Sequence, residues 1–414
     1  METPTKTDNG MPIAEDMVRG IDVSNGFDFY HVFENFATPK QLKVRDAVRD
    51  YMENEVKPHI NDYWERAEFP MELFLKARDI EPHFIGGIVR GRGAAGLDPL
   101  EAGLVAYEMA RVDGSIGTAH GVHTALGMTP IAFLGNDEQR DRWLPRMANL
   151  ELIGAFGLTE PARGSAATDI QTTARKVGSE YVLNGAKRWI GNAAFAGVLI
   201  IWARDENGDI GGFVIEHPQE VEGVTIENIQ GKIAKRAVMN ADITLQDVVV
   251  PAANRLPKVR SFQDIGKVLL LGRIGVAWEA AGLAEGLFTA ALEYAREREQ
   301  FGKRIAEFQL IQDKLVEMAT EVTLMQMMCF QLASMTAFGQ LTPGVASMAK
   351  YNNARKARRV AALARETLGG NGIVLDYHVA RLFTDAEATY TYEGTNEIQT
   401  LIVGREITGY SAFV

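Results

Sequence analysis

The stretch at residues 385–409, DAEATYTYEGTNEIQTLIVGREITG, decides how the rest of the chain is interpreted. Within it, Glu393 lies in an uncharged turn between Tyr392 and Gly394, with no basic residue next to it in sequence. Because loss of water disfavours the ionised form of a carboxyl group, we expect a pKa of Glu393 raised into the range of a general base. The alternative is a surface glutamate in a tyrosine-rich loop, and this string alone does not exclude it.

A helix is predicted directly after this turn. Thr395 suits the N-cap position, apolar residues recur behind it at helical spacing, and Gly409 suits the C-terminal stop. Glu393 is therefore expected just outside a helix start. The glycine beside it, Gly394, lets a ligand or another backbone segment come close.

Length and composition indicate several packed domains, because 414 residues exceed what one core usually organises and 46% of them are hydrophobic. The net charge of −11, without a dense run of Lys and Arg, argues against a nucleic-acid partner. The single cysteine, Cys329, excludes a disulfide framework and indicates a reducing compartment, and the seven histidines show no metal-ligand spacing. The first twenty residues are polar and resemble neither a signal peptide nor a membrane span, so no membrane partner is expected.

The pattern along the chain predicts an α+β architecture without an internal repeat. We expect a mobile extension at 1–37, an α-helical domain at 38–151, a β-domain at 152–260 and a C-terminal four-helix-type bundle at 261–414. In the β-domain, VLIIWARDENGDIGGFVIE predicts two strands joined by a polar turn. The Asn184-Gly185 pair predicts a tight hairpin within YVLNGAKRWI.

The string GRGAAG at residues 91–96 fits the dinucleotide-binding pattern G-x-G-x-x-G. That fingerprint requires a βαβ unit with the third glycine inside the opening helix. Here the helix is predicted to start only at Asp98-Pro99, and Asp113 follows a helix rather than a strand. We therefore interpret the string as a loop between helices, and a nicotinamide-dependent enzyme using it is one competing hypothesis.

Four further segments contain residue types suited to holding a cofactor. They are LTEPARGS (158–165), KRWIGN (187–192), REREQFGK (296–303) and LGGNG (368–372). The first offers hydroxyl and backbone N–H groups for carbonyl or phosphate oxygens, the second a tryptophan that can stack on a planar ring. The third is a basic turn that can bind a pyrophosphate, and the glycines of the fourth permit close backbone approach. A β-turn, core packing or a solvated charge run are the ordinary alternatives.

Together with YEGT and in this order, the motifs closely resemble the acyl-CoA dehydrogenase and acyl-CoA oxidase superfamily from about Thr38 onward. The chain looks most like glutaryl-CoA dehydrogenase and the short-chain peroxisomal acyl-CoA oxidase of plants with related bacterial enzymes. The resemblance implies an FAD flavoprotein, a homotetramer built as a dimer of dimers, that oxidises an acyl-CoA thioester to the trans-2-enoyl-CoA. Its usual electron acceptor is electron-transferring flavoprotein. Because the tail SAFV is not a peroxisomal address, a cytoplasmic enzyme is expected.

The resemblance also implies residue roles. Glu393 matches the catalytic base, which takes the α-proton while the β-carbon delivers hydride to flavin N5. Positions that match cofactor contacts are Thr159, Ser165, Trp189, Gly191, Arg298, Phe301, Gln309, Glu366, Gly369, Gly370, Thr395 and Glu397, of which those from Arg298 to Gly370 hold the FAD of the neighbouring subunit. Positions that match or are expected to make substrate contacts are Ser165, Arg273, His123 and Gly394.

Three departures from the family pattern affect the expected activity. Gly117 replaces the arginine that binds the distal carboxylate in glutaryl-CoA dehydrogenases, so a monocarboxylic acyl-CoA is expected instead of glutaryl-CoA. Gly191 replaces a threonine and is expected to open space beside the flavin, so an acyl-CoA oxidase using O2 remains an alternative. Ala166 replaces the usual aspartate, which leaves the detail of that loop open. A redox-inactive acyl-CoA-binding or scaffold protein is the other competing class.

Overall fold

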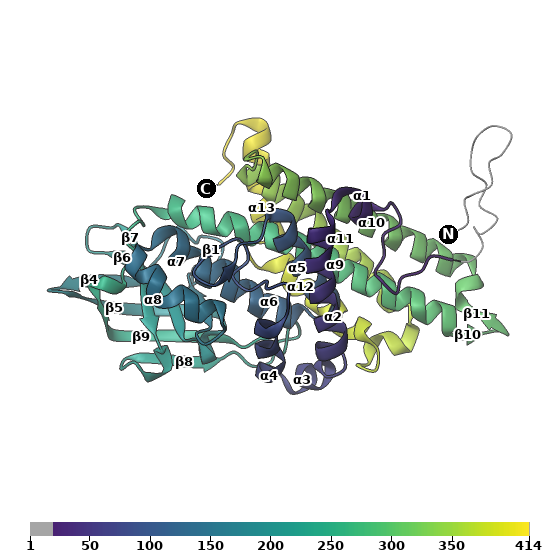
Figure 1. Cartoon of the computed structure of the whole chain (residues 1–414), viewed down its shortest axis with the longest axis horizontal. Coiled ribbons are helices and arrows are strands. Elements are labelled where there is room, and N and C mark those ends of the chain that lie inside the picture. Colours follow the sequence, from purple (N-terminus) through teal and green to yellow (C-terminus); the bar gives the residue numbers. More distant parts are fainter. Residues whose placement is uncertain (1–19, 414) are drawn as a thin grey trace.

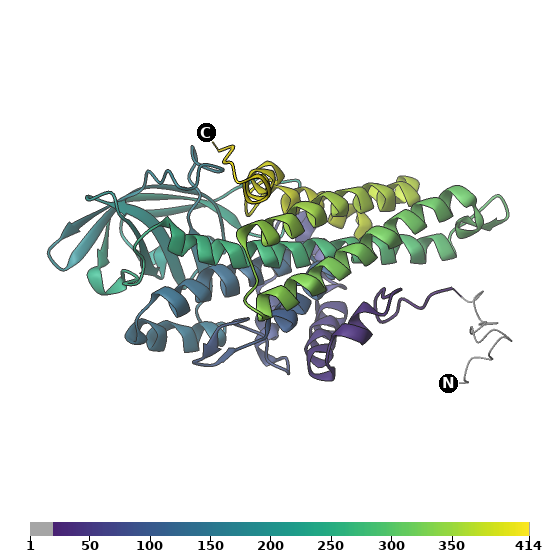
Figure 2. The ribbon, with the colours of Figure 1, turned by 90° about the horizontal axis from the view of Figure 1, so that it is seen from above.

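The structure, a computed structural model, describes residues 20–413 and shows a β-domain that is preceded and followed in sequence by helical regions (Figure 1). The sheet lies at one end of the elongated molecule. The longest helix, α9 (Phe262–Glu297), runs from beside the sheet to a small hairpin at the opposite end (Figure 2). Among the described residues, no helix is long and apolar enough to cross a membrane.

The N-terminal region is helical, as expected. Its helices are α2 (Pro39–Tyr51), α3 (Ile60–Arg66), α4 (Met71–Leu75), α5 (Pro99–Val112), α6 (Gly114–Gly121), α7 (Thr129–Leu134) and α8 (Asp137–Ala148). Three of them begin at a capping box, formed by Thr38 with Gln41, Asp98 with Glu101, and Asn136 with Gln139. In each box two otherwise unpaired backbone N–H groups gain side-chain acceptors, which fixes where the helix starts.

The glycine-rich string at 91–96 forms a short hairpin of β1 (Arg90–Gly91) and β2 (Ala94–Ala95). The next helix begins only behind Asp98, as the sequence predicted. The string therefore does not join a strand to a helix N-terminus, which the dinucleotide-binding fingerprint requires.

The prediction of a mobile extension at 1–37 is wrong for residues 20–37. Residues 20–37 include α1 (Val32–Phe36), and the side chains of Val23, Phe27 and Phe33 are buried in the core of the C-terminal bundle. Burying these apolar groups fixes the segment on the bundle. Residues 1–19 lie outside the described part of the chain.

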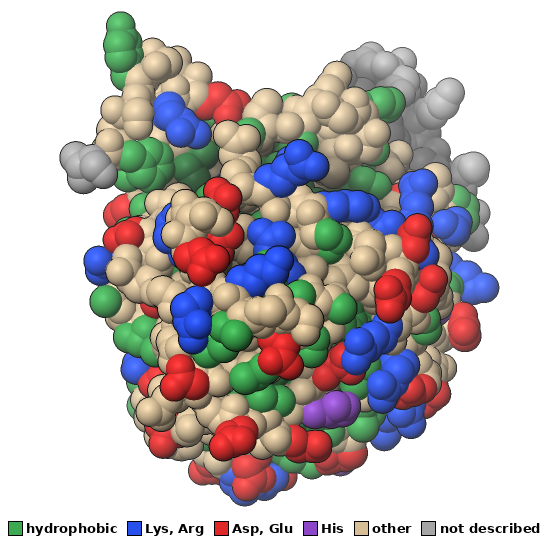
Figure 3. Space-filling model, turned by 90° about the vertical axis from the view of Figure 1, so that its left-hand side faces the viewer, with side chains coloured by type: hydrophobic (Ala, Val, Ile, Leu, Met, Phe, Trp, Pro, Cys, Tyr) green, Lys and Arg blue, Asp and Glu red, His purple; other side chains and the backbone are tan. Residues whose placement is uncertain are grey.

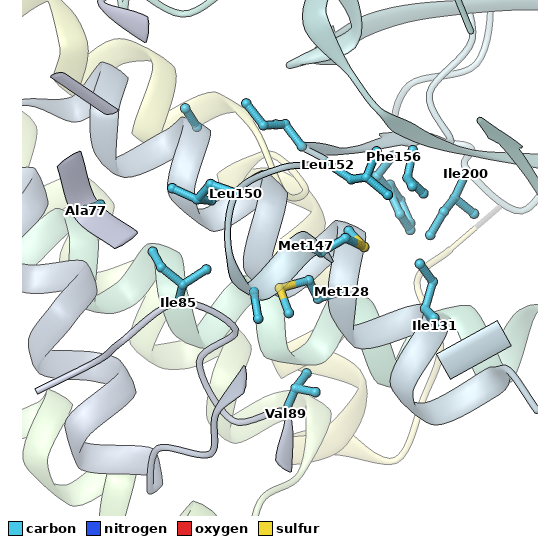
Figure 4. Packing of buried hydrophobic residues seen from close by; sticks show 14 of the residues in the cluster. Ala77, Ile85, Val89, Met128, Ile131, Met147, Leu150, Leu152, Phe156 and Ile200 are labelled. Atoms are coloured by element: carbon cyan, nitrogen blue, oxygen red, sulfur yellow. The ribbon is translucent and has the colours of Figure 1, made fainter. Parts of the chain in front are cut away.

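The β-domain contains one seven-stranded sheet in the order β3-β6-β4-β5-β9-β8, with β7 on β6. Its strands are β3 (Gly154–Gly157), β4 (Thr173–Val177), β5 (Glu180–Gly191), β6 (Val198–Asp205), β7 (Ile210–Glu216), β8 (Val224–Asn228) and β9 (Asn240–Pro251). Alternate residues of β6 enter different cores, since Ile200 packs against the N-terminal helices and Ile201 packs on the other face. Figure 4 shows Ile200 and Phe156 beside Met128 and Met147 in the core between the two domains.

The hairpin predicted at Asn184-Gly185 is wrong. Strand β5 continues through these residues, and the turn to β4 lies earlier, between Val177 and Glu180. The Asn184 side chain instead donates to Asp247 Oδ1 on β9 at 3.0 Å, next to a register shift in the β5–β9 pairing. A turn-forming pair can thus be absorbed by a β-bulge inside a long strand.

The C-terminal bundle contains α9 (Phe262–Glu297), α10 (Gln309–Ala337), α11 (Pro343–Thr367), α12 (His378–Thr391) and α13 (Asn396–Thr408). A short hairpin of β10 (Glu299–Gln300) and β11 (Lys303–Arg304) joins α9 to α10 at the far end of the molecule. The N-terminal helix α5 packs closely on α9, because a Cβ atom at Gly282 would overlap the carbonyl oxygen of Tyr107. Glycine at this position therefore lets the two domains share one core.

Figure 3 shows the face of the molecule at the β-domain end. Lys and Arg side chains lie among Asp and Glu side chains over this face, without the continuous basic groove of a nucleic-acid-binding surface.

Candidate active site

The turn that holds Glu393 lies between α12 and α13. Its backbone is left-handed at two successive residues, with φ of 52° at Glu393 and 85° at Gly394. Gln399 Nε2 on α13 donates to the carbonyl oxygens of Glu393 at 3.0 Å and Gly394 at 2.8 Å. Lys350 Nζ on α11 donates to the carbonyl oxygens of Gly394 and Tyr390, both at 2.9 Å. Two helices thus fix the turn. The prediction of a helix after it is also confirmed, because Thr395 is the N-cap of α13 and Gly409 its C-cap.

The carboxylate of Glu393 is half-buried and forms no hydrogen bond or ion pair within residues 20–413. It lies against α9, where a Cβ atom built on Gly272 would come within 2.6 Å of Glu393 Oε2. Burial raises the pKa of Glu393 to about 7, while the positive charges of Arg273 and Lys350 oppose this rise and Glu279 adds to it. The pKa therefore lies in the range of a general base at neutral pH.

Two further groups beside this carboxylate lack partners in the described part of the chain. The backbone N–H of Glu393 donates to no acceptor there. Arg273, which follows Gly272 on α9, forms no ion pair among residues 20–413, and its buried Nε has no hydrogen-bond partner. Burial lowers the pKa of Arg273 and Glu393 opposes this effect. A free carboxylate, a free N–H and a free guanidinium thus lie next to one another.

Behind the turn lies a polar cluster that the sequence analysis did not identify. Lys235 Nζ pairs with Glu279 Oε1, and donates to the Tyr392 hydroxyl at 2.6 Å and to Thr118 Oγ1 at 2.7 Å. The Tyr392 hydroxyl in turn donates to Glu279 Oε2. A signal existed for Glu279, because it is a lone acid in the apolar α9 segment VAWEAAG, where a buried charge needs a partner.

The predicted flavin-contacting residues of the β-domain share one edge, where β3 and β5 end. Thr159 is half-exposed and its carbonyl oxygen accepts from the backbone N–H of Arg188 at 2.9 Å, which places it beside Trp189. Trp189 is 52% exposed, with the Arg188 guanidinium 5.1 Å from its ring centroid. In the exposed loop that follows, the backbone N–H groups of Gly164 and Ser165 have no acceptor among the described residues. Free N–H and hydroxyl groups beside an exposed indole fit a ligand with a planar ring and polar oxygens.

The Val122 side chain lies close to Gly191. Gly191 is buried, and a Cβ atom built on it would come within 3.2 Å of Val122 Cγ2. The Val122 side chain therefore narrows the space beside Gly191, and the expected opening toward a bound flavin stays a prediction.

His123 does not face an open site. It is fully buried, its Nδ1 accepts from the Gly154 N–H at 2.9 Å, and its Nε2 lies 3.0 Å from the Met147 carbonyl oxygen. Burial lowers its pKa to about 4, so the ring is neutral. Both nitrogens are engaged with backbone between an N-terminal helix and β3. The prediction of a substrate-contacting His123 is therefore wrong.

The remaining predicted cofactor residues lie at two places. Thr395 and Glu397 are at the start of α13, which directly follows the Glu393 turn in sequence, and Glu397 is exposed. The other six lie where α9 ends, α10 begins and α11 ends, and all are exposed in this chain: Arg298, Phe301, Gln309, Glu366, Gly369 and Gly370. Glu366 forms an ion pair with Lys314 at 3.0 Å.

The distance between the two places follows from the helix that connects them. Arg298, the C-cap of α9, follows Gly272 by 26 residues, which is about 39 Å at the α-helical rise per residue. This length exceeds what a single dinucleotide can span. One chain therefore does not bring the six exposed residues to its own Glu393.

Comparison with known proteins identifies the family of the chain. Models of the acyl-CoA dehydrogenase N-terminal, middle and C-terminal domains match residues 38–151, 155–248 and 262–408. The chain belongs to the acyl-CoA dehydrogenase family. The resemblance seen in the sequence, the α+β fold class, the oxidoreductase class of the acyl-CoA dehydrogenases and the FAD cofactor are thereby confirmed.

Similar acyl-CoA dehydrogenase relatives extend over nearly the whole chain. A probable acyl-CoA dehydrogenase of Bacillus subtilis is 35% identical over 378 residues, covering 89% of this chain and 98% of that protein. A glutaryl-CoA dehydrogenase from Mycobacterium smegmatis superposes with a TM-score of 0.88 at 36% identity, covering 91% of this chain and 96% of that chain. Another glutaryl-CoA dehydrogenase structure from Mycobacterium smegmatis, in complex with FADH2, has a TM-score of 0.89 at 32% identity and covers 92% and 97%.

Proposed function

We propose that this member of the acyl-CoA dehydrogenase family is an FAD-dependent enzyme that converts a saturated acyl-CoA into the trans-2-enoyl-CoA, with Glu393 as the base. The supporting observation is the unpaired, half-buried carboxylate of Glu393 with a pKa of about 7. A carboxylate with this pKa is ionised in part at neutral pH and accepts a proton more readily than an exposed glutamate.

The neighbouring groups suit the abstraction of an α-proton from a thioester. That proton is far too weak an acid for a carboxylate alone, so the thioester carbonyl must be polarised by hydrogen-bond donors. The free N–H of Glu393 is such a donor, and Arg273 supplies positive charge near the Glu393 carboxylate. FAD, when bound, supplies the acceptor for the hydride that leaves the β-carbon. Exclusion of water by a bound acyl chain would strengthen each of these interactions.

The residues that would hold FAD come from two copies of the chain in this proposal. Thr159, Ser165 and Trp189 form the edge near the base, and a second copy supplies the exposed turn around Arg298 and Phe301. This arrangement is supported by the roughly 39 Å of α9 between Gly272 and Arg298 and by the 96% exposure of Phe301 in one chain. We therefore propose a homotetramer built as a dimer of dimers.

The proposed substrate is a monocarboxylic acyl-CoA of short to medium length. Gly117 offers no charge to a distal carboxylate, and a Cβ built there points toward Met109 at 3.4 Å. Lys235, the cation nearest to Tyr392, already uses three donors on Glu279, Tyr392 and Thr118. A dicarboxylate would therefore have to be buried without a charged partner from position 117 or from Lys235, which is costly.

For the electron acceptor we propose electron-transferring flavoprotein in the cytoplasm, and not O2. The argument for an oxidase depended on open space beside Gly191, and the Val122 side chain narrows that space. The only cysteine of the chain, Cys329, is buried, which is compatible with a reducing compartment.

An anaerobic titration of the purified protein with saturated acyl-CoAs of increasing length tests the proposal. We expect loss of the oxidised flavin absorbance with formation of the trans-2-enoyl-CoA, with the lowest half-saturation at the preferred chain length. A yellow protein that no acyl-CoA reduces would contradict it.

A further inference from the structure

The polar cluster behind the base joins three domains. Lys235 lies in the loop between β8 and β9 of the middle domain, Glu279 lies on α9 of the bundle, and Thr118 lies on α6 of the N-terminal domain. Tyr392, the residue before Glu393, completes the cluster at the end of α12. These segments are far apart in sequence, and one ammonium group contacts side chains from all of them.

A contact with another domain holds the backbone of Lys235 in place, in addition to its side chain. The backbone of Lys235 is left-handed, with φ of 44°, and its N–H donates to Asp385 Oδ1 on α12 at 2.5 Å. A Cβ atom built on Gly114 would come within 3.1 Å of Lys235 Cε, so α6 begins directly against the lysine chain. A non-glycine residue in this conformation is costly and persists only where surrounding contacts determine it.

The contacts of Lys235 leave no free donor for a ligand. Its Nζ pairs with Glu279 and donates to Tyr392 and Thr118, and an ammonium group has three N–H bonds. Burial by itself would lower the pKa of Lys235, but Glu279 and Tyr392 outweigh burial and raise it, so the lysine is charged. All three N–H bonds of Lys235 are therefore used within the cluster, as expected of a residue that holds the adjacent turn in place instead of binding a ligand.

We propose that Lys235 and Glu279 are positioning residues for the catalytic base: through the Tyr392 hydroxyl they fix the turn that holds Glu393 and connect it to the middle domain. On the other side of the turn, Lys350 and Gln399 bind backbone carbonyl oxygens. The carboxylate of Glu393, which has no hydrogen bond of its own within residues 20–413, is thus oriented by its backbone. This inference depends on the proposed function, because it assumes that Glu393 is the base.

Lys235 and Glu279 also contribute to the electrostatic environment of Glu393. Facing Glu393 are Arg273 and Glu279 from α9 and Lys350 from α11. Lys235 neutralises Glu279. Removing the negative charge of Glu279 should therefore lower the pKa of Glu393, and removing Lys235 should raise it, because Glu279 is then left uncompensated. Loss of packing alone predicts no such opposite shifts.

The test measures proton abstraction apart from hydride transfer. Acetoacetyl-CoA has acidic hydrogens on C2 and none on C3, so only the first step can occur. The C2–H bond breaks, the proton forms an O–H bond on the Glu393 carboxylate, and the electron pair is delocalised over the two carbonyl groups. The enolate absorbance is followed by stopped-flow spectroscopy of the holoenzyme across pH 5 to 9, with the thermal midpoint measured in parallel.

The variants are Tyr392→Phe, Glu279→Gln and Lys235→Met, with Tyr51→Phe as the matched control. Tyr51 also loses a buried hydroxyl bond, to the Leu73 carbonyl oxygen at 3.0 Å, but lies in the N-terminal core away from the base. We expect Tyr392→Phe to slow enolate formation by about 10- to 100-fold, as misplaced reacting groups do, and the control to leave it unchanged. The apparent pKa should fall in Glu279→Gln and rise in Lys235→Met.

The outcomes separate the two proposals. Enolate formation at the wild-type rate in Glu393→Gln would overturn the proposed function. If Glu393→Gln abolishes the enolate but Tyr392→Phe and Glu279→Gln retain the wild-type rate and pH profile, the positioning role is wrong. Should Lys235→Met fail to fold, these two variants still decide, because each keeps the Lys235 side chain.

Discussion

Gly272 on α9 and Glu393 in the turn between α12 and α13 are in contact: a Cβ atom on Gly272 would come within 2.6 Å of the carboxylate oxygen Oε2. The helix backbone of α9 therefore forms the wall against which the base lies. Glycine lowers the stability of a helix interior. Its presence at position 272 is explained by the Glu393 carboxylate, which leaves no room for a side chain there.

Replacing Gly272 with alanine is expected to displace the base without unfolding the protein. The group that must move is the end of a flexible side chain, so the shift costs little stability, but an ångström of misplacement can lower the rate of proton abstraction by about 100-fold. Flavin reduction by a saturated acyl-CoA in a stopped-flow instrument measures this rate. Gly266→Ala is the control on the same helix, because a Cβ atom there meets nothing within 4 Å. Equal rates in both variants would contradict the contact.

Glu393→Gln is expected to keep the fold and bound FAD but to abolish reduction by substrate, with a loss of about 1,000-fold or more. The amide has nearly the shape of the carboxylate and cannot accept the α-proton. Anaerobic mixing with acyl-CoA gives the rate, and the absorbance ratio of flavin to protein gives the cofactor content. Flavin reduction by the variant at the wild-type rate would show that another residue is the base.

The pH dependence of activity and stability should both report on Glu393. Its pKa is raised from 4.5 to about 7, so the ionised base, and with it kcat/KM, should increase as the pH rises through 7. Between pH 4.5 and 7 the folded state binds more protons than the unfolded state, so this group makes the free energy of unfolding fall as pH increases. A comparison of thermal midpoints at pH 5 and pH 8 in wild type and Glu393→Gln isolates this contribution. An equal pH slope in the two proteins would contradict the raised pKa.

Arg298→Ala is expected to weaken FAD binding and subunit assembly together. The reason is that Arg298 lies about 39 Å along α9 from Gly272 in the same chain, so its proposed cofactor contact belongs to a second copy. Analytical ultracentrifugation with detection at flavin and protein wavelengths follows both properties in one experiment. Arg78→Ala, at an exposed arginine of the N-terminal domain, is the control. A stable yellow monomer of the wild-type protein would refute the shared site.

The sequence predicted features that depend on neighbours along the chain and missed those that depend on folding. Thr395 and Gly409 could be predicted as the two ends of a helix because capping depends on residues adjacent in sequence, and the residues of the YEGT string are also adjacent in sequence. Lys235 and Glu279 pair across 44 residues, so neither shows its partner in sequence. Asn184 was misassigned because its partner, Asp247, lies on a strand 63 residues away. His123 was misassigned because a polar residue type does not reveal that its ring nitrogens face backbone groups.

Substrate preference is the prediction that most directly separates this chain from the glutaryl-CoA dehydrogenases that it superposes on. Gly117 presents no charge, and the three donors of Lys235 are engaged, so neither residue offers a partner to a desolvated distal carboxylate. Burial of an unpaired charge costs several kcal/mol, and a difference of about 4 kcal/mol corresponds to roughly a thousandfold in kcat/KM. We therefore expect kcat/KM for butyryl-CoA or hexanoyl-CoA to exceed that for glutaryl-CoA by about 1,000-fold, measured with the same artificial electron acceptor.

Glutaryl-CoA differs from valeryl-CoA by one carboxylate in place of a methyl group, which makes valeryl-CoA the matched control substrate. Efficient turnover of glutaryl-CoA with release of carbon dioxide would show that a cation reaches the distal carboxylate, and Arg273, which has no ion pair among the described residues, would be the first to replace by methionine.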